Sequence, residues 1–315
     1  MEAEIRSKHP ETLRLGYPRR YRVPDGWPSP AAVSVLMAGY YLGAIPRQVL
    51  DSDEATRSAF LVASELYRRK VPTYFVGKEL LPALLDTDPP EDMAAAEIPW
   101  PVPAAVFMLP NGALASPKDG PVRFLAVARG QAGRSYAPHD DALCGLRMEH
   151  DALALWTVAE GPGLATFGKT ARLEGTLADL MRDGSSNLVA GDGSASELPA
   201  DDAAFVARLT NIAASLLLLM AARPEMVESA DEVVKRIKAK PGSGKTADDL
   251  WAPRWVGRNY RRPRPSAGDE AGNHASPRPH MRRGHWRRQR HGEGRAESRL
   301  VWIELTYVLA EKPGA

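Results

Sequence analysis

Apolar positions in the first quarter of the chain recur with helical spacing. In the segment 51–70, Phe60 and Tyr67 fall close to one face, with acidic residues in the first turn and basic residues in the last. Residues 30–43 are apolar enough to form a buried helix. Residues 1–27 are polar and interrupted by prolines, which predicts an arm with little structure of its own. The chain is therefore expected to begin with an arm and a helical region.

The middle of the chain changes to short apolar runs separated by turn residues, a pattern typical of antiparallel strands. These runs cover residues 103–109, 122–128 and 152–159. Residues 201–222 predict a long helix that is apolar on nearly every face and therefore buried, and residues 226–238 predict a second helix. Alternation over 301–308 predicts a final strand. Together the patterns predict an α+β fold: a helical N-terminal part, a central antiparallel sheet, a buried long helix, and a C-terminal strand after an arginine-rich segment.

A glycine- and serine-rich stretch at residues 241–250 contains part of a phosphate-binding loop. Gly244, Lys245 and Thr246 match the end of the Walker A pattern, but Ala239 stands where its first glycine is required. A charged, helix-like stretch precedes the loop instead of a buried strand, so we interpret it as a linker and not as an NTPase site. The expected organisation is an arm (1–27), a globular body (28–240), the linker (241–250), and an arginine- and histidine-rich segment with a closing strand (251–315).

The charges of the chain are distributed unevenly. The whole chain has a formal net charge of +2. Residues 251–299, however, contain 13 arginines, no lysine and four acidic residues, a net charge of +9, so the remainder carries −7. An arginine-rich segment beside a mildly acidic body favours a polyanionic partner for that segment.

Three features bear on the cellular compartment. Cys144 is the only cysteine, which excludes an intrachain disulfide and fits a reducing environment. The first residues mix acidic and basic side chains and do not have the pattern of a secretory signal. The longest apolar run, residues 212–222, is too short to span a bilayer of roughly 30 Å. We expect a cytoplasmic protein with no membrane partner.

Residues 251–299 combine the two residue types that nucleic-acid-binding proteins use. Guanidinium groups donate paired hydrogen bonds to phosphates and base edges, and the aromatic residues between them offer faces for base stacking. If the stretch 280–289 is extended, Trp286 and Arg287 point to opposite faces. We predict a nucleic-acid-binding protein, with RNA favoured over DNA as the partner. The predicted contact residues are Arg254, Arg258, Arg261, Arg262, Arg278, Arg282, Arg283, Trp286, Arg287 and Arg288.

Two other functions stay open. His280 and His285 are candidate catalytic residues of a metal-independent, toxin-like ribonuclease, in which an imidazole takes the 2′-hydroxyl proton and another cation stabilises the phosphorane. The arginine segment could instead dock on an acidic protein, and the acidic loop 88–92 could pair with it within the chain. Cys144 and His150 lie among other liganding types, but their spacing matches no zinc motif. We predict no metal and no cofactor.

The stretch SPRPHMRRGHWRRQ, followed after a gap by VWIELTYV, resembles the C-terminal element of a group of uncharacterised proteins encoded by phages, plasmids and bacterial chromosomes. That group carries a similar S-P-R-x-H-x-R-R-G-H element before a W-[IV]-x-P-x-x-V strand. The stretch TDPPEDMAAAEIPWPVPAAVFMLP also resembles segments of the group. Leu305 stands where those proteins tend to have proline. The resemblance implies a mobile-element context and no particular activity.

Overall fold

The computed structural model describes ten stretches of the chain. These are residues 23–28, 54–68, 73–136, 146–160, 164–182, 188–189, 195–196, 200–229, 253–263 and 280–308. The predicted helix over 30–43, the linker over 241–250 and the predicted contact residue Arg278 lie outside the described residues.

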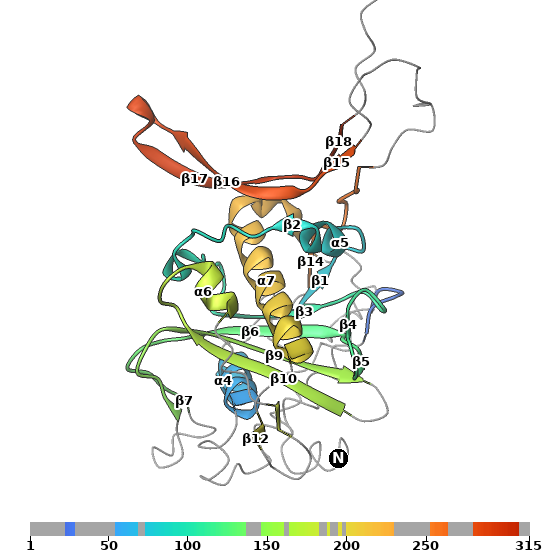
Figure 1. The fold of residues 1–315 in the computed structure, drawn as a ribbon, viewed down its shortest axis with the longest axis vertical. Helices are drawn as coiled ribbons and strands as arrows, with labels where there is room; N and C mark the ends of the chain where they lie inside the picture. Colours follow the sequence, from blue (N-terminus) through green and yellow to red (C-terminus); the bar gives the residue numbers. More distant parts are fainter. Residues whose placement is uncertain are drawn as a thin grey trace, which may run out of the picture.

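A seven-stranded mixed sheet forms the centre of the fold (Figure 1). Its strands, in spatial order, are β10 (Leu164–Arg172), β9 (Ala152–Glu160), β6 (Phe124–Gly130), β3 (Ala104–Met108), β1 (Thr73–Val76), β14 (Arg254–Val256) and β13 (Val227–Ser229). The predicted antiparallel sheet is present, because β10, β9, β6 and β3 pair in antiparallel fashion. It is widened by β1, which pairs parallel with both β3 and β14. The predicted helix over 226–238 is wrong at its start, where β13 forms an antiparallel edge strand.

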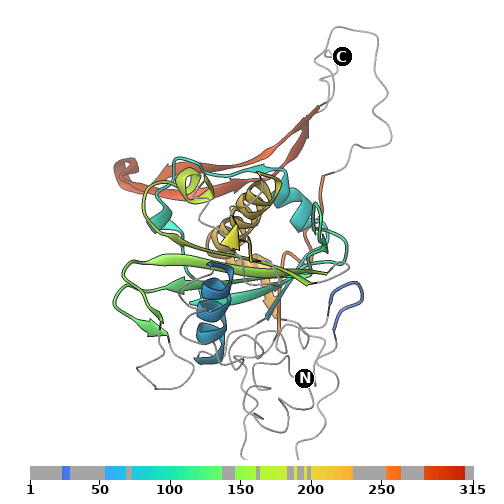
Figure 2. The same cartoon turned by 60° about the horizontal axis from the view of Figure 1, so that its bottom comes forward.

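Side chains alternate along each strand, so the sheet has an apolar core on both faces. Tyr74 and Val76 point into the larger core, where α7 (Ala200–Ala222) lies with the short helices α5 (Leu80–Leu85) and α6 (Leu177–Arg182). Phe75 points into the smaller core, which α4 (Glu54–Arg68) covers from the opposite side (Figure 2). The sheet is therefore a layer between helices.

The long helix α7 is apolar nearly all round because other elements surround it. It packs on the sheet below, on α5 and α6 at its sides, and on a C-terminal hairpin above (Figure 1). By length and composition α7 could cross a membrane, but most of it is buried inside the protein. The predicted buried long helix is confirmed, and it has the character of a core helix.

A long hairpin closes the chain on top of α7, and we call residues 280–308 the arginine hairpin. One arm consists of β15 (His280–Arg282) and β16 (Gly284–His291), and the other of β17 (Glu297–Ile303) and β18 (Thr306–Val308). Both pairs of strands share one continuous antiparallel register. β16 also pairs parallel with β2 (Thr87–Asp88) of the body. The predicted C-terminal strand is confirmed, and it curves across the top of the molecule and beyond it (Figure 1).

The remaining elements are short. Three two-stranded pairs join β4 (Ala115–Ser116) to β5 (Gly120–Pro121), β7 (Ser135–Tyr136) to β8 (Leu146–Arg147), and β11 (Leu188–Val189) to β12 (Ala195–Ser196). Single 3₁₀ turns lie at η2 (Ala95–Glu97), η3 (Pro224–Met226) and η5 (Glu293–Arg295), the last at the tip of the arginine hairpin.

Candidate nucleic-acid interface

Two tryptophans fix the arginine hairpin to the body. Trp286 and Trp302 are cross-strand neighbours, and their side chains are only 7% and 2% exposed. Their ring centroids are 6.4 Å apart, and that of Tyr260 lies 5.5 Å from Trp302. The predicted alternation is confirmed here, because Trp286 points inward while Arg287 is exposed. Trp286 is therefore an anchor in the core and does not offer its ring as the stacking platform that we predicted.

Close packing at Gly284 sets the height of the arginine hairpin above the body. A Cβ atom at Gly284 would lie 2.6 Å from Oγ1 of Thr87 and 3.2 Å from the carbonyl oxygen of Ile303. The Thr87 hydroxyl donates to the carbonyl oxygen of Ala83 at 2.7 Å and accepts a hydrogen bond from Nε1 of Trp302 at 3.3 Å. The contact between β16 and β2 therefore needs a glycine at position 284, since Oγ1 of Thr87 is fixed in place by two hydrogen bonds.

Ion pairs join the arginine hairpin and the segment before it to acidic residues of the body. Arg262 Nη2 lies 2.6 Å from Oδ2 of Asp86, and Arg283 Nη1 lies 3.7 Å from Oδ1 of Asp88. Arg288 pairs with Glu97. The contact with Asp88 confirms that the acidic loop 88–92 pairs with the arginine segment. The three arginines were predicted nucleic-acid contacts, and each is partly neutralised within the chain.

A second set of arginines in the hairpin is exposed and has no carboxylate partner among the described residues. They are Arg282, Arg287, Arg290, Arg295 and Arg299. Sequence reasoning named Arg282 and Arg287 and missed the other three. Alternation along β16 puts Arg290 on the face of the buried Trp286, yet Arg290 is exposed near the end of the strand. Arg299 shares the face of Arg287, because β17 places it opposite Gln289. The exposed set runs along both arms and the tip, so it forms one positively charged ribbon.

The two candidate catalytic histidines are not brought together by the hairpin. His280 pairs with Val308 in β15, and His285 pairs with Ile303 in β16. Five residues of extended chain separate their Cα atoms by about 16 Å. An acid and a base that act on one phosphate must both come within hydrogen-bonding reach of it. The strand geometry does not provide such a pair.

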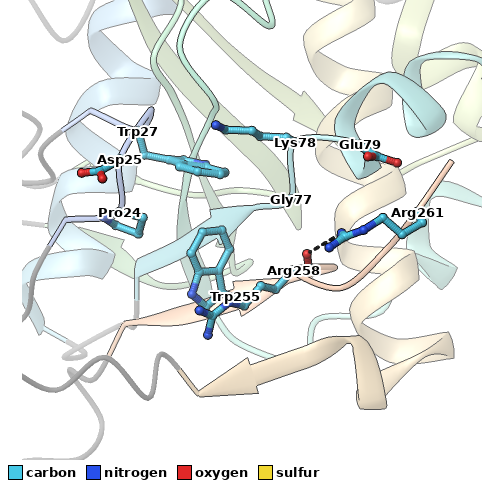
Figure 3. Close-up of a pocket in the computed structure, with 9 residues that line it drawn as sticks. All are labelled: Pro24, Asp25, Trp27, Gly77, Lys78, Glu79, Trp255, Arg258 and Arg261. Carbon is cyan, nitrogen blue, oxygen red and sulfur yellow. Dashed lines mark hydrogen bonds between the residues drawn. The ribbon is translucent and has the colours of Figure 1, made fainter.

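A pocket of about 550 Å³ opens where β1 and β14 end (Figure 3). The backbones approach closely there: the Gly77 N–H donates to the carbonyl oxygen of Val256 at 2.9 Å, and a Cβ atom on Gly77 would lie 2.1 Å from the Gly257 carbonyl oxygen. The N-terminal stretch 23–28 covers one side of the pocket. The Trp27 indole donates from Nε1 to the carbonyl oxygen of Val76 at 3.0 Å, and its ring meets that of Trp255 edge-on, with centroids 4.9 Å apart.

Three cations and two carboxylates line this pocket. Lys78 Nζ lies 5.1 Å from the ring centroid of Trp27, and the guanidinium carbon of Arg258 lies 5.3 Å from that of Trp255. Arg261 Nη1 donates to the carbonyl oxygen of Tyr260 at 3.0 Å (Figure 3 shows its second bond, to the Arg258 carbonyl). Asp25 and Glu79 are the acidic members, and Glu79 accepts the backbone N–H of Arg262 at 2.7 Å.

The pocket holds two predicted contact residues, Arg258 and Arg261, and two residues that sequence reasoning missed. Trp27 and Lys78 lie in distant parts of the chain, and no local motif marks either of them. The predicted contact residue Arg254 lies half-buried in β14, where its charge opposes the rise that burial causes in the pKa of Tyr74.

Tyr260 and Arg262 connect the pocket to the arginine hairpin. Tyr260 lies between the pocket residues Arg258 and Arg261 in the chain and packs on Trp302, and burial raises the pKa of its hydroxyl to about 12. Arg262 lies 3.9 Å, through Nη2, from the sulfur of Met281 in β15. The pocket and the hairpin are therefore neighbouring parts of one basic surface.

The sequence over the sheet and the hairpin identifies a family. Residues 74–310 match the family model of the AcrVA2-like proteins, described as the anti-CRISPR type V subtype A2 family. The match runs from β1 through α7 and β14 to the end of the arginine hairpin. No curated protein matches the chain. An anti-CRISPR family agrees with the phage- and plasmid-encoded group that the sequence resembles. Because the match covers about three quarters of the 315 residues, the chain belongs to the AcrVA2-like anti-CRISPR family.

Proposed function

We propose that the protein counteracts a type V CRISPR system by binding RNA through the arginine hairpin. The observation that carries this proposal is the set of exposed arginines without carboxylate partners in the described structure, presented on a ribbon that two buried tryptophans hold in place. Guanidinium groups that have no carboxylate partner in the described part of the chain can pair with phosphates. Action against a CRISPR system also fits the cytoplasmic location expected from the sequence.

The shape of the hairpin suits a strand of nucleic acid. From Arg282 to Arg290 the extended arm is about 26 Å long, which allows several phosphates to be contacted in succession. The exposed basic residues are all arginine or histidine, which favours paired hydrogen bonds and stacking on unpaired bases over simple charge attraction. Unpaired bases are the usual target of sequence-specific RNA recognition, and RNA is therefore the expected ligand.

The test is the salt dependence of RNA binding. The hairpin variant Arg282→Gln, Arg287→Gln, Arg290→Gln removes three charges from one arm. The control variant Arg172→Gln, Arg182→Gln, Arg208→Gln removes three exposed charges elsewhere. With a fluorescent single-stranded RNA, log K should fall with log salt concentration for the wild type, and the hairpin variant should reduce that slope by about 2, because each phosphate contact on a single strand contributes about 0.7. The control should keep the wild-type slope.

Absence of RNA binding at low salt, or equal slopes for the hairpin and control variants, would refute the proposal. Tighter binding to DNA of the same sequence would identify DNA, and not RNA, as the ligand of the arginine hairpin. The plating efficiency of a phage on a host with a matching type V system measures anti-CRISPR activity. If the hairpin variant lost that activity although the wild type bound no nucleic acid, an acidic protein would be the partner. We expect RNA to stay intact, and cleavage that His285→Ala abolishes would favour a ribonuclease instead.

A further inference from the structure

We propose that the pocket between Trp27 and Trp255 binds one nucleoside monophosphate, either free or as the terminal nucleotide of an RNA. The tryptophans would contact the base, and Lys78, Arg258 and Arg261 would contact the phosphate. The site is separate from the arginine hairpin, and the inference does not depend on the proposed function.

The first argument is the position of the pocket on the sheet. Strands β3, β1 and β14 are parallel, so their carboxyl ends lie at the same edge. The stretch 23–28 crosses this edge, held by the bond from Trp27 to Val76 and by a hydrogen bond from the Asn111 N–H to the Gly26 carbonyl oxygen at 2.8 Å. Ligands of open α/β sheets bind in crevices outside the carboxyl ends of parallel strands. The pocket is therefore where such a sheet would be expected to hold a small molecule.

The second argument is the charge of the lining. Three cations face two carboxylates, and one of those, Glu79, already accepts a backbone hydrogen bond from Arg262. Arg261 is held by backbone carbonyl oxygens, which orient its guanidinium group without neutralising it. A surplus of positive charge in a partly enclosed site favours an anion and opposes a metal cation.

The third argument is the aromatic part of the lining. Trp27 is half-buried, and the rings of Trp27 and Trp255 meet edge-on beside the cations. An inorganic anion would use none of this apolar surface, whereas a base can stack on an indole face while its phosphate reaches the cations. The volume of about 550 Å³ lies within the range usual for small-molecule sites. Asp25, at the exposed rim, offers an acceptor for a ribose hydroxyl.

Calorimetric titration of the full chain tests the site directly. AMP, GMP, CMP and UMP are the probes, with adenosine and inorganic phosphate as partial ligands. We expect at least one nucleotide to bind about tenfold or more tightly than either partial ligand, since each lacks one half of the contacts. Lys78→Gln and Arg258→Gln should each weaken the binding of that nucleotide about tenfold, because a charge-assisted hydrogen bond is lost. Arg172→Gln, a matched exposed arginine, should leave it unchanged.

The hairpin variant separates this inference from the proposed function. It should bind nucleotides as the wild type does, even where it no longer binds internal RNA segments. In that background, a 5′-phosphorylated RNA that binds more tightly than its 5′-hydroxyl form would assign the pocket to an RNA end, and equal binding of the two would assign it to a free nucleotide. Thermal unfolding of Lys78→Gln checks that this exposed substitution leaves the fold intact. Trp27→Phe is a second variant, directed at the proposed contact between Trp27 and the base.

Three results would overturn the inference. They are no heat of binding at millimolar nucleotide, binding that is unchanged in both Lys78→Gln and Arg258→Gln, and inorganic phosphate that binds as tightly as every nucleotide.

Discussion

The substitution Gly284→Ala is expected to weaken the contact between the arginine hairpin and the body. The new Cβ atom would lie 2.6 Å from Oγ1 of Thr87, well inside van der Waals contact. Thr87 cannot move aside freely, because its hydroxyl is hydrogen-bonded to Ala83 and to Trp302. The carbonyl oxygen of Ile303, at 3.2 Å, restricts movement of the hairpin in the other direction. The clash must therefore be relieved by opening the contact between β16 and β2.

The cost can be estimated from three contributions. Inserting a methyl group into a packed site costs about 1–3 kcal/mol. Loss of the hydrogen bond from Trp302 to Thr87 adds about 1 kcal/mol. Replacing glycine by alanine in a strand offsets roughly 0.5–1 kcal/mol of this loss, since the unfolded chain becomes less flexible. The net destabilisation is about 2 kcal/mol, which corresponds to a fall in Tm of roughly 4–8 °C for a domain of this size.

A double-mutant cycle measured by denaturant unfolding checks the cause. Thr87→Ala removes the obstructing oxygen. The double variant Gly284→Ala, Thr87→Ala should therefore lose about 1 kcal/mol less stability than the two single variants lose together. Gly130→Ala is the control, because the Cβ atom there would meet the ends of the Met148 and Leu61 side chains at 3.1 and 3.2 Å and the Ala152 Cβ atom at 3.6 Å, and no atom closer than these. Additive effects at Gly284 and Thr87, or an equal loss for Gly130→Ala, would refute the packing argument.

Three further predictions concern the stability of the body. A hydrogen bond from the Ala132 N–H, and after it one from the Arg129 side chain, lowers the pKa of Asp151 below its usual 3.8. The ionised carboxylate therefore contributes to stability above pH 3.8, and this contribution is lost as the pH falls through the lowered pKa. Asp151→Asn should lower Tm at pH 7, with a smaller effect toward pH 3, by circular dichroism. Burial raises the pKa of Tyr260 to about 12 from 10.0, so the contribution of its neutral hydroxyl to stability is fully present below pH 10 and is lost as the pH rises toward 12. Tyr260→Phe should therefore reduce the decline in Tm above pH 10. Leu217→Ala, in the core around α7, should cost about 2–5 kcal/mol in urea unfolding, and a smaller loss would contradict the burial of α7 on all sides.

The elements that depend on local pattern were predictable. Helix α7 is recognisable because apolar residues on every face of one helix must be enclosed by other elements. Strands β3, β6 and β9 are recognisable because short apolar runs between turn residues have few alternatives in a globular chain. The edge strand β13 was not predictable from local pattern, since residues 227–229 lie in a helix-like stretch and become a strand only by hydrogen bonding to β14. Tertiary pairing overrides local propensity at such a position.

The candidate interface was only partly predictable. The arginine-rich segment is evident from composition, and the inward and outward positions of Trp286 and Arg287 follow from strand alternation. Whether the inward face meets solvent or a core does not follow, because that depends on where the hairpin lies. Here it lies on the end of α7, so Trp286 became an anchor. The arginines facing Asp86, Asp88 and Glu97 became partly neutralised for the same reason.

By itself, the sequence determined the α+β class, the enclosed long helix, and the concentration of arginine in the last fifth of the chain, because these depend on residue type and near-neighbour spacing. Only the tertiary structure decided which arginines stay unpaired and where a pocket forms. Trp27, Lys78 and Trp255 meet because β1 and β14 pair in parallel although about 180 residues separate them. Parallel pairing leaves no local pattern in the chain, since its hydrogen bonds join segments that carry no turn between them.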